Sequence, residues 1–265
     1  MKRAVRLLLV ALAPAGLLAA CGDDPTDSSD PTSRAATELE GGIAVSAAAS
    51  LTEAFTEIGD DFTAANPGAE ITFNFDSSSA LATQILEGAP ADVFASADEA
   101  NMTRLTDEDV VAGEPEVFAR NELVIVTRAG NPEGITGLAD LADAGIISLC
   151  GEEVPCGELA THVLDAAGVT IPESSITRGQ NVKATLTAVA EGDAVAGIVY
   201  VTDATAAGDR VEAVTIPPAD NAVVPYPIGV LVSSGDPDVA AAFVAHVRGA
   251  DGRAVLEEHG FLPPE

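Results

Sequence analysis

Short apolar runs rich in β-forming residues alternate with amphipathic helical patterns along most of this 265-residue chain, and this alternation limits its fold more than any other feature. The clearest helical pattern has Leu51, Ala54, Phe55, Ile58 and Phe62 on one face. Because strand-helix-strand units favour parallel pairing, we predict an α/β protein with mostly parallel sheets flanked by helices. The expected strands are 43–47, 71–75, 92–95, 123–127, 146–149, 194–200 and 228–232.

The N-terminus has the pattern of a secreted lipoprotein. Three basic residues precede an apolar run over 7–20 that is too short to span a bilayer, so we interpret residues 1–20 as a signal peptide. The run ends in Leu-Ala-Ala-Cys-Gly, the spacing of a bacterial lipobox, which predicts lipidation of Cys21. An ordinary cleavage site with an incidental cysteine is the alternative. Residues 21–41 are acidic, with few apolar side chains, and are expected to form a disordered tether.

The chain is strongly acidic, with a formal net charge of −30. Removal of the signal peptide leaves 9 basic against 42 acidic residues, a charge of −33. Such a field repels nucleic acid, so we expect no nucleic-acid partner. It also repels small anions at long range, so an anion site would depend on local dipoles.

Hydroxyl residues stand where strands lead into helices, which is where open α/β sheets bind their ligands. Ser50 follows three alanines and precedes Glu53 by three positions, which indicates either a capping box or an anion contact at a helix start. A second turn, 76–80, carries three serines, which serve as caps or as donors. Two such turns after consecutive strands favour an oxyanion site.

Two cysteines remain if Cys21 carries lipid. Cys150 and Cys156 would then face an oxidising compartment across a short loop, so we expect a disulfide. Their spacing fits neither a redox motif nor a zinc site, and surface or core roles are expected for the histidines, His162, His246 and His259. From another functional class, a secreted hydrolase using Ser50 or Cys156 is the alternative, although the sequence has no G-x-S-x-G elbow and no evident histidine partner.

Three further residues have two interpretations each. Arg178 and Lys183 flank the turn 179–183 and either contact an anion or lie on a solvated helix start. Tyr200 ends an apolar strand, where its ring either packs in the core or presents a hydroxyl to a ligand.

Seven motifs, in order, resemble the molybdate-binding periplasmic proteins of the type II solute-binding class, over about residues 43–261. They are AAASL (47–51), SSS-x-L (77–81), QILEGAPADVFASAD (84–98), VPCG (154–157), NVKATL (181–186), GIVYVTDA (197–204) and HGF (259–261).

The resemblance implies a two-lobed type II periplasmic-binding-protein fold, with lobe I over 42–121 and 227–265 and lobe II over 122–226. Hinge bending near 120–127 and 223–228 would close the cleft between them. It further implies a binding protein, not an enzyme, that captures molybdate or tungstate without a cofactor or a directly coordinated metal. Its partner would be the membrane permease of an ABC importer, and we expect a monomer held outside the cell membrane by lipidated Cys21.

Five ligand contacts follow from matching the family's motifs to this chain. Ser50 and Ser78 would bind the oxyanion through their hydroxyls from lobe I. Cys156 and Val182 through their N–H groups, and Tyr200 through its hydroxyl, would bind from lobe II. The family pattern has alanine where this chain has Cys156, and a disulfide to Cys150 could shift that loop.

Proton chemistry separates the possible ligands. Molybdate carries no proton near neutral pH, so a site for it offers donors and no carboxylate, and Asp76 and Glu53 in the matched turns are expected to point away. Hydrogenphosphate instead profits from a carboxylate that accepts its proton. A receptor for sulfate or phosphate on the same fold is the closest alternative.

Overall fold

The computed structural model describes residues 39–265, which belong to one compact unit. The expected signal peptide, the lipidation site at Cys21 and nearly all of the expected tether lie outside the described residues. Regular structure begins with a strand at Gly41, at the very end of the expected tether.

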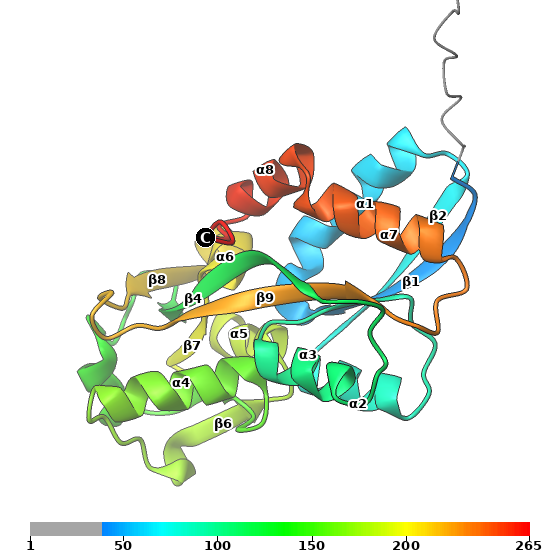
Figure 1. Ribbon diagram of the computed structural model, residues 1–265. Coiled ribbons are helices and arrows are strands. Elements are labelled where there is room, and N and C mark those ends of the chain that lie inside the picture. The colour runs from blue at the N-terminus through cyan, green and yellow to red at the C-terminus, as the bar shows by residue number, and fades with distance from the viewer. Residues whose placement is uncertain (1–38) are drawn as a thin grey trace, which may run out of the picture. The chain divides into compact units, whose positions relative to one another are not determined.

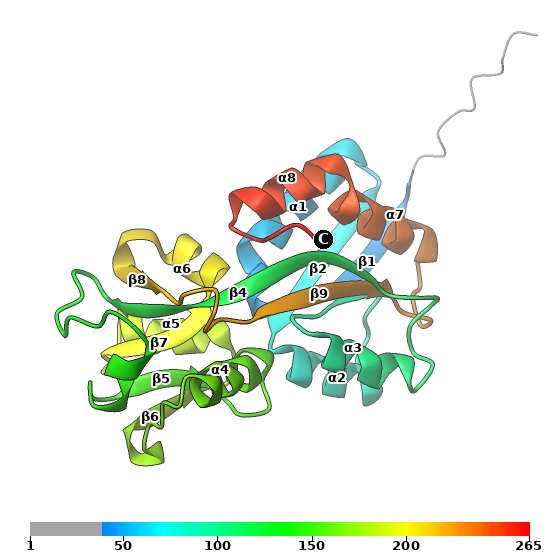
Figure 2. The same cartoon turned by 60° about the vertical axis from the view of Figure 1, so that its left-hand side comes forward.

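Strands and helices alternate along the described chain, as Figures 1 and 2 show. Their bounds are β1 (Gly41–Ala48), η1 (Ala49–Leu51), α1 (Thr52–Ala65), β2 (Ala69–Asp76), α2 (Ser78–Leu86), β3 (Val93–Ala95), α3 (Glu99–Thr106), β4 (Glu116–Arg128), η2 (Leu138–Ala142), β5 (Ile147–Cys150), α4 (Pro155–Ala166), η3 (Glu173–Ser175), β6 (Ile176–Gly179), α5 (Val182–Ala190), β7 (Ala196–Tyr200), α6 (Val201–Ala207), η4 (Gly208–Arg210), β8 (Val211–Thr215), β9 (Val223–Val230), α7 (Pro237–Arg248) and α8 (Ala250–Glu258).

The strands follow the order β2-β1-β3-β9-β4-β7-β5-β6, with β8 added beside β4. Strands β2, β1 and β3 pair in parallel and form what we call the first half-sheet, while β7, β5 and β6 form a second parallel half-sheet. Every antiparallel pair involves β4 or β9. The sheet is therefore mixed, and the predicted α/β class with flanking helices is confirmed.

Two long strands join the half-sheets and lie side by side in Figures 1 and 2. Strand β4 pairs with β9 over residues 116–122 and with β7 and β8 over residues 123–128. Strand β9 pairs with β3 as well as with β4. Both half-sheets therefore pair with the same antiparallel ribbon, which consists of β4 and β9.

Helix α1 shows why its sequence folds onto the sheet. Its predicted apolar face is buried, and the Phe55 ring lies 5.6 Å from that of Phe118 and 6.1 Å from that of Phe243, measured between centroids. Each such ring contributes roughly 1.5–3 kcal/mol through burial. On the neighbouring face Gly59 lies against the Phe73 ring, where a Cβ would come within 2.7 Å of a ring carbon. A larger residue at this position would therefore require the Phe73 ring to shift.

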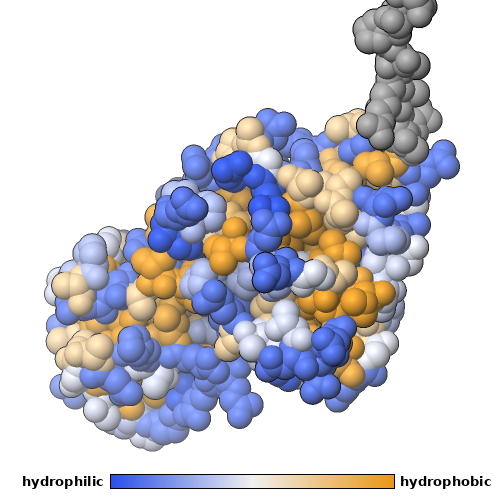
Figure 3. Space-filling view, viewed as in Figure 1, coloured by the Kyte–Doolittle hydropathy of each residue, from blue (hydrophilic) through white to orange (hydrophobic). Residues whose placement is uncertain are grey.

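The described surface is mixed in character. On the face drawn in Figure 3, hydrophilic residues cover much of the surface and hydrophobic residues lie between them. Among residues 39–265 no helix combines the length and apolar character needed to cross a bilayer.

Candidate functional site

A small cavity lies where strands of both half-sheets end. All five residues predicted to contact a ligand line it: Ser50, Ser78, Cys156, Val182 and Tyr200. The rest of its lining is made by small, apolar or amide-bearing residues: Ala48, Ala49, Ser77, Ala97, Val154, Pro155 and Asn181. No carboxylate or basic side chain of the described residues lines the cavity.

The arrangement follows from the order of the elements. The lining residues lie at the carboxyl ends of β1, β2, β3, β5, β6 and β7, in most cases where a helix begins. Free N–H groups at helix starts carry partial positive charge, so several such ends around one point attract an anion.

The two serines of the first half-sheet present buried hydroxyls. Ser50 lies in η1, and α1 begins without a side-chain cap, so Ser50 does not form the capping box that its spacing allowed. Its Oγ lies 2.9 Å from the hydroxyl of Tyr226. In the serine run, Ser77 caps α2 by accepting from Ala80 N–H, whereas Ser78 Oγ accepts from Ala97 N–H at 2.9 Å.

Two helices of the second half-sheet offer backbone donors. Pro155 has no N–H, so Cys156 carries the first N–H of α4. Val182 is the first residue of α5, whose cap Asn181 accepts from Ala184 N–H at 3.0 Å. The N–H groups of Cys156 and Val182 have no acceptor within their helices because of these positions.

Tyr200 presents the third hydroxyl. The residue is 1 % exposed, and its hydroxyl has no hydrogen-bond partner within hydrogen-bond distance and angle among the described residues. The ring of Tyr226 packs against the ring of Tyr200, with 5.9 Å between their centroids. Burial raises the pKa of Tyr200 well above its ordinary value, and neighbouring Tyr226 and Asp98 add to the shift. The phenol therefore keeps its proton and is an unpaired donor at the cavity wall.

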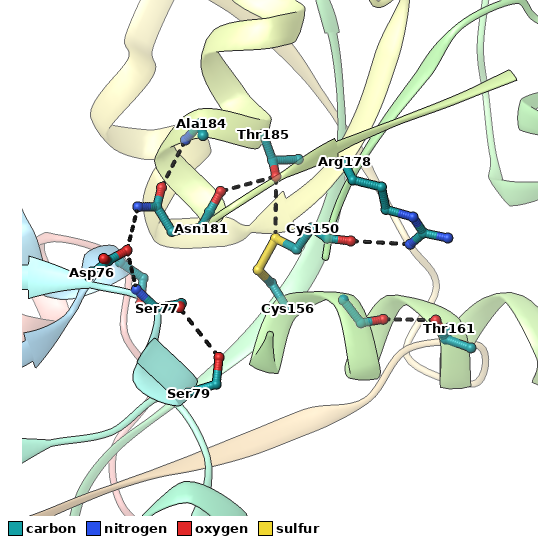
Figure 4. The surroundings of a disulfide bond; sticks show 12 residues. Asp76, Ser77, Ser79, Cys150, Cys156, Thr161, Arg178, Asn181, Ala184 and Thr185 are labelled. Atoms are coloured by element: carbon teal, nitrogen blue, oxygen red, sulfur yellow. Dashed lines mark hydrogen bonds between the residues drawn. A yellow bond between two sulfur atoms is a disulfide. The ribbon is translucent and has the colours of Figure 1, made fainter. Parts of the chain in front are cut away.

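Cys150 and Cys156 form a disulfide that joins the end of β5 to the start of α4 (Figure 4). Thr185 of α5 donates to Cys150 Sγ at 3.3 Å, so all three elements meet here. Gly157 permits this approach, because a Cβ there would come within 1.9 Å of the carbonyl oxygen of Gly151. The disulfide therefore fixes the first turn of α4, which carries the N–H of Cys156.

Removing this disulfide should destabilise the protein. The bond closes a loop between residues six apart, and the loss of such a constraint on the unfolded chain lowers the free energy of unfolding by about 2 kcal/mol. Urea unfolding of the Cys150→Ser/Cys156→Ser variant against the oxidised parent measures the difference. Dithiothreitol should destabilise the parent and leave the variant unchanged. Equal midpoints for the two oxidised proteins would contradict the expectation.

The nearby charges pair with one another outside the cavity wall. Lys183 Nζ lies 2.6 Å from Glu53 Oε2 and 3.1 Å from Asp203 Oδ1. Arg178 pairs with Glu152 and with a second glutamate, Glu173, and donates to a backbone carbonyl. Neither basic residue lines the cavity, so the interpretation of Arg178 and Lys183 as direct anion contacts is not what the structure shows.

Asp203 is fully buried and contacts Lys183 as an ion pair without hydrogen-bond geometry. Burial raises the pKa of Asp203 to about 6, and Lys183 opposes the shift. For Lys183 burial lowers the pKa, but Asp203 and Glu53 outweigh it and the net shift is upward. The lysine therefore stays charged and compensates a buried carboxylate.

Polar contacts also join the two sides of the cavity. Glu53 on α1 pairs with Lys183 on α5, and Asn181 Nδ2 donates to Asp76 Oδ1 at 3.0 Å (Figure 4). Glu53 thus pairs with Lys183, Asp76 accepts from Asn181, and neither carboxylate lines the cavity.

The histidines of the described residues lie apart from the cavity. His259 contacts Glu57 at 2.8 Å, and the ring of His246 packs 5.5 Å from that of Phe62. No group of three or more potential metal ligands occurs within residues 39–265. Since Cys156 is bound in a disulfide and no histidine faces Ser50 across the cavity, the lining provides no activated nucleophile.

Comparison with known proteins gives the family. The family model described as "Bacterial extracellular solute-binding protein" matches residues 43–262. The chain belongs to this family. Membership confirms the predicted resemblance to solute-binding proteins and places the protein outside the cytoplasm.

Individual solute-binding proteins extend the comparison. The molybdate-binding protein ModA of Mycobacterium tuberculosis is 42% identical over 260 residues, 97% of each chain. The solved substrate-binding domain of a putative molybdenum ABC transporter from Clostridium difficile is 28% identical, with a TM-score of 0.64 over 84% of this chain and 99% of that one. The sulfate-binding protein SubI of Mycobacterium tuberculosis shares the fold, with a TM-score of 0.76 at 19% identity over 84% of this chain and 87% of that one.

These relatives are solute-binding proteins, so the prediction of a protein that is not an enzyme is confirmed and the hydrolase alternative is wrong. Sequence reasoning missed three polar residues beside the solute cavity: Asn121, Asp203 and, as a partner of Ser50, Tyr226. Asn121 and Tyr226 lie within β4 and β9, and Asp203 lies within the motif 197–204, but no spacing in the sequence assigns their side chains a contact.

Proposed function

We propose that this protein captures molybdate or tungstate outside the cell membrane and delivers it to an ABC importer. The observation that carries the proposal is a buried cavity lined by hydroxyl and amide donors without a carboxylate. A fully deprotonated oxyanion only accepts hydrogen bonds and is matched by such a lining. The relative named as a molybdate-binding protein, 42% identical over 97% of this chain, supports the same ligand.

Five donors would replace the water shell of the ion. They are the hydroxyls of Ser50, Ser78 and Tyr200 and the N–H groups of Cys156 and Val182. Burying an ion without such partners costs several kcal/mol even after relaxation, so the donors must converge from both sides. The free hydroxyl of Tyr200 and the helix starts at Cys156 and Val182 support this assignment.

Closure of two lobes would complete the site. In this proposal lobe I spans 42–121 and 227–265, and lobe II spans 122–226. The two lobes would move relative to each other by hinge bending in β4 and β9. Contacts from Lys183 to Glu53 and from Asn181 to Asp76 would hold the closed form that the permease recognises. A monomer anchored through lipidated Cys21 suits this role, because a single tethered copy reaches its permease by diffusion in two dimensions.

Isothermal titration calorimetry with each anion tests the ligand. We expect saturable, tight binding of molybdate and tungstate by the purified protein and negligible heat with phosphate. Hydrogenphosphate brings a proton that finds no carboxylate to accept it in the lining, which accounts for its rejection. Saturation by phosphate or sulfate at the same concentrations as molybdate would overturn the assignment.

Sulfate is the second candidate ligand, because the fold is shared with a sulfate-binding protein and sulfate also lacks a proton at neutral pH. Its smaller tetrahedron would leave longer contacts to a set of donors placed for molybdate. Competition calorimetry separates the two ions, since a sulfate receptor would lose molybdate on addition of sulfate in modest excess.

Replacing Tyr200 with phenylalanine should weaken molybdate binding by about 1 to 3 kcal/mol, the usual loss for one hydrogen bond to a charged acceptor. The ring packing against Tyr226 is retained in this variant, so the fold should persist. Calorimetry of variant and parent at one pH measures the change. An unaltered dissociation constant would remove Tyr200 from the ligand contacts.

A further inference from the structure

A buried series of hydrogen-bonded side chains leads from the sheet to the cavity. Asn121 on β4 and Tyr226 on β9 are both fully buried, and Ser50 is 4 % exposed. Asn121 Nδ2 lies 3.3 Å from the Tyr226 hydroxyl, which in turn lies 2.9 Å from Ser50 Oγ. Only Ser50 of the three lines the cavity.

The side-chain amide of Asn121 has a fixed orientation. Asn121 Oδ1 accepts the backbone N–H of Glu122 at 3.0 Å, and a backbone N–H is always a donor. The opposite atom, Nδ2, therefore carries the hydrogens, which reach Thr202 Oγ1 at 2.9 Å and the Tyr226 hydroxyl at 3.3 Å. Tyr226 thus accepts from Asn121.

The orientation of the Asn121 amide also determines the direction of the hydrogen bond between Tyr226 and Ser50. With its oxygen accepting from Asn121 at 3.3 Å, the hydroxyl of Tyr226 is placed to donate its hydrogen to Ser50 Oγ at 2.9 Å, the shorter of these two hydrogen bonds. Burial raises the pKa of Tyr226, so the phenol keeps this hydrogen at all working pH values. The reverse arrangement, with Ser50 donating to Tyr226, would take this acceptor away from the buried phenol hydrogen.

A serine whose oxygen already accepts from Tyr226 has its own hydrogen free. The Ser50 hydroxyl can then turn its hydrogen toward the cavity without losing a bond. Ser78 is arranged in the same way, since its Oγ accepts Ala97 N–H. Both serines would therefore have their hydrogens available to a ligand.

We propose that Asn121 and Tyr226 are positioning residues that hold the hydroxyl of Ser50 as a donor toward the bound oxyanion. The proposal rests on the proposed function, because it assigns the hydrogen that the anion would accept. Both positioning residues come from the two strands that join the half-sheets, so the orientation of Ser50 depends on the ribbon about which closure would occur.

A double-mutant cycle on the full-length protein tests this role, with molybdate affinity measured by calorimetry. We expect Tyr226→Phe to weaken binding by about 5-fold to 30-fold in the parent, and by less than about 2-fold in a Ser50→Ala background, because residues that act through one another are not additive. A residue with a merely structural role would lower the affinity by the same factor in both backgrounds.

Thr202→Val is the matched control, because it removes the other acceptor of the Asn121 amide. It leaves the hydrogen bonds from Asn121 to Tyr226 and from Tyr226 to Ser50 intact. It should leave the molybdate affinity within about 2-fold of the parent. If Tyr226→Phe does not fold, as judged by circular dichroism, Asn121→Ala replaces it in the same cycle with the same expected coupling.

Equal losses in both backgrounds, or an unchanged affinity on Tyr226→Phe, would overturn the positioning role while molybdate binding by the parent stands. Failure of the parent itself to bind molybdate would overturn the proposed function, and the positioning role with it.

Discussion

Replacing Lys183 with methionine is expected to lower the free energy of unfolding by about 2 to 3 kcal/mol at pH 7.5. The change leaves Asp203, which is 0 % exposed, as a buried carboxylate without a counter-charge. Breaking a buried ion pair from one side typically costs about 3 to 5 kcal/mol, and the partial exposure of the lysine reduces this figure. Urea unfolding of variant and parent measures the difference.

The loss should depend on pH in a defined direction. Burial raises the pKa of Asp203 to about 6, against about 3.9 in an unfolded chain, so the folded state binds this proton more tightly. The stability that Asp203 contributes is therefore present below about pH 4 and is lost as the pH rises toward 6. Without Lys183 the folded pKa rises further, so the gap between variant and parent should widen between about pH 6 and 8.

The double variant Lys183→Met/Asp203→Asn is the control for this prediction. It removes the orphaned carboxylate and should recover most of the lost stability, with no widening above pH 6. A single Lys183→Met variant as stable as the parent at pH 7.5 would show that the lysine does not compensate Asp203.

Substituting Val182 with proline is expected to weaken molybdate binding by about 100-fold or more, the largest effect on affinity that we expect from one substitution. Proline lacks the N–H, and its ring carbon occupies the place where that hydrogen pointed, so the change removes a donor and also displaces the oxyanion. The fold should tolerate it, because Val182 is the first residue of α5 and the preceding Asn181 has extended backbone angles of −153° and 176°.

Ala250→Pro is the matched control for the backbone donor. Ala250 is the first residue of α8, is exposed and does not line the cavity. Calorimetry should find parental affinity for Ala250→Pro beside a severe loss for Val182→Pro. Similar affinities for both variants, with both folded, would mean that the amide of Val182 does not contact the ligand.

Much of the fold was predictable because its strongest patterns are local. The spacing of apolar residues from Leu51 to Phe62 predicted the helix observed as α1, and six expected strands overlap β1, β2, β3, β4, β5 and β7. Strands β6 and β8 were missed, since each is only four or five residues long and contains two polar residues. The observed β9 begins five residues before the expected strand, because Pro225 and Pro227 broke the β-type pattern.

The candidate site was predicted from turns and motifs and not from side-chain chemistry. Five residues from five separate turns line one cavity because parallel strands bring their carboxyl ends together. Asn121 and Tyr226 escaped prediction because their contacts to one another and to Ser50 join positions 105 and 176 residues apart. Such contacts arise only in the folded protein, from the pairing of β4 with β9 and the packing of η1 near Tyr226, which local patterns do not encode.

A crystal structure of the protein grown with molybdate, with the metal located by anomalous scattering, tests the central claim most directly. The account predicts one molybdate in the cavity, with its oxygens within about 3.2 Å of the hydroxyls of Ser50, Ser78 and Tyr200 and the N–H groups of Cys156 and Val182. A molybdate bound elsewhere, or a carboxylate found in contact with the ion in this cavity, would contradict it.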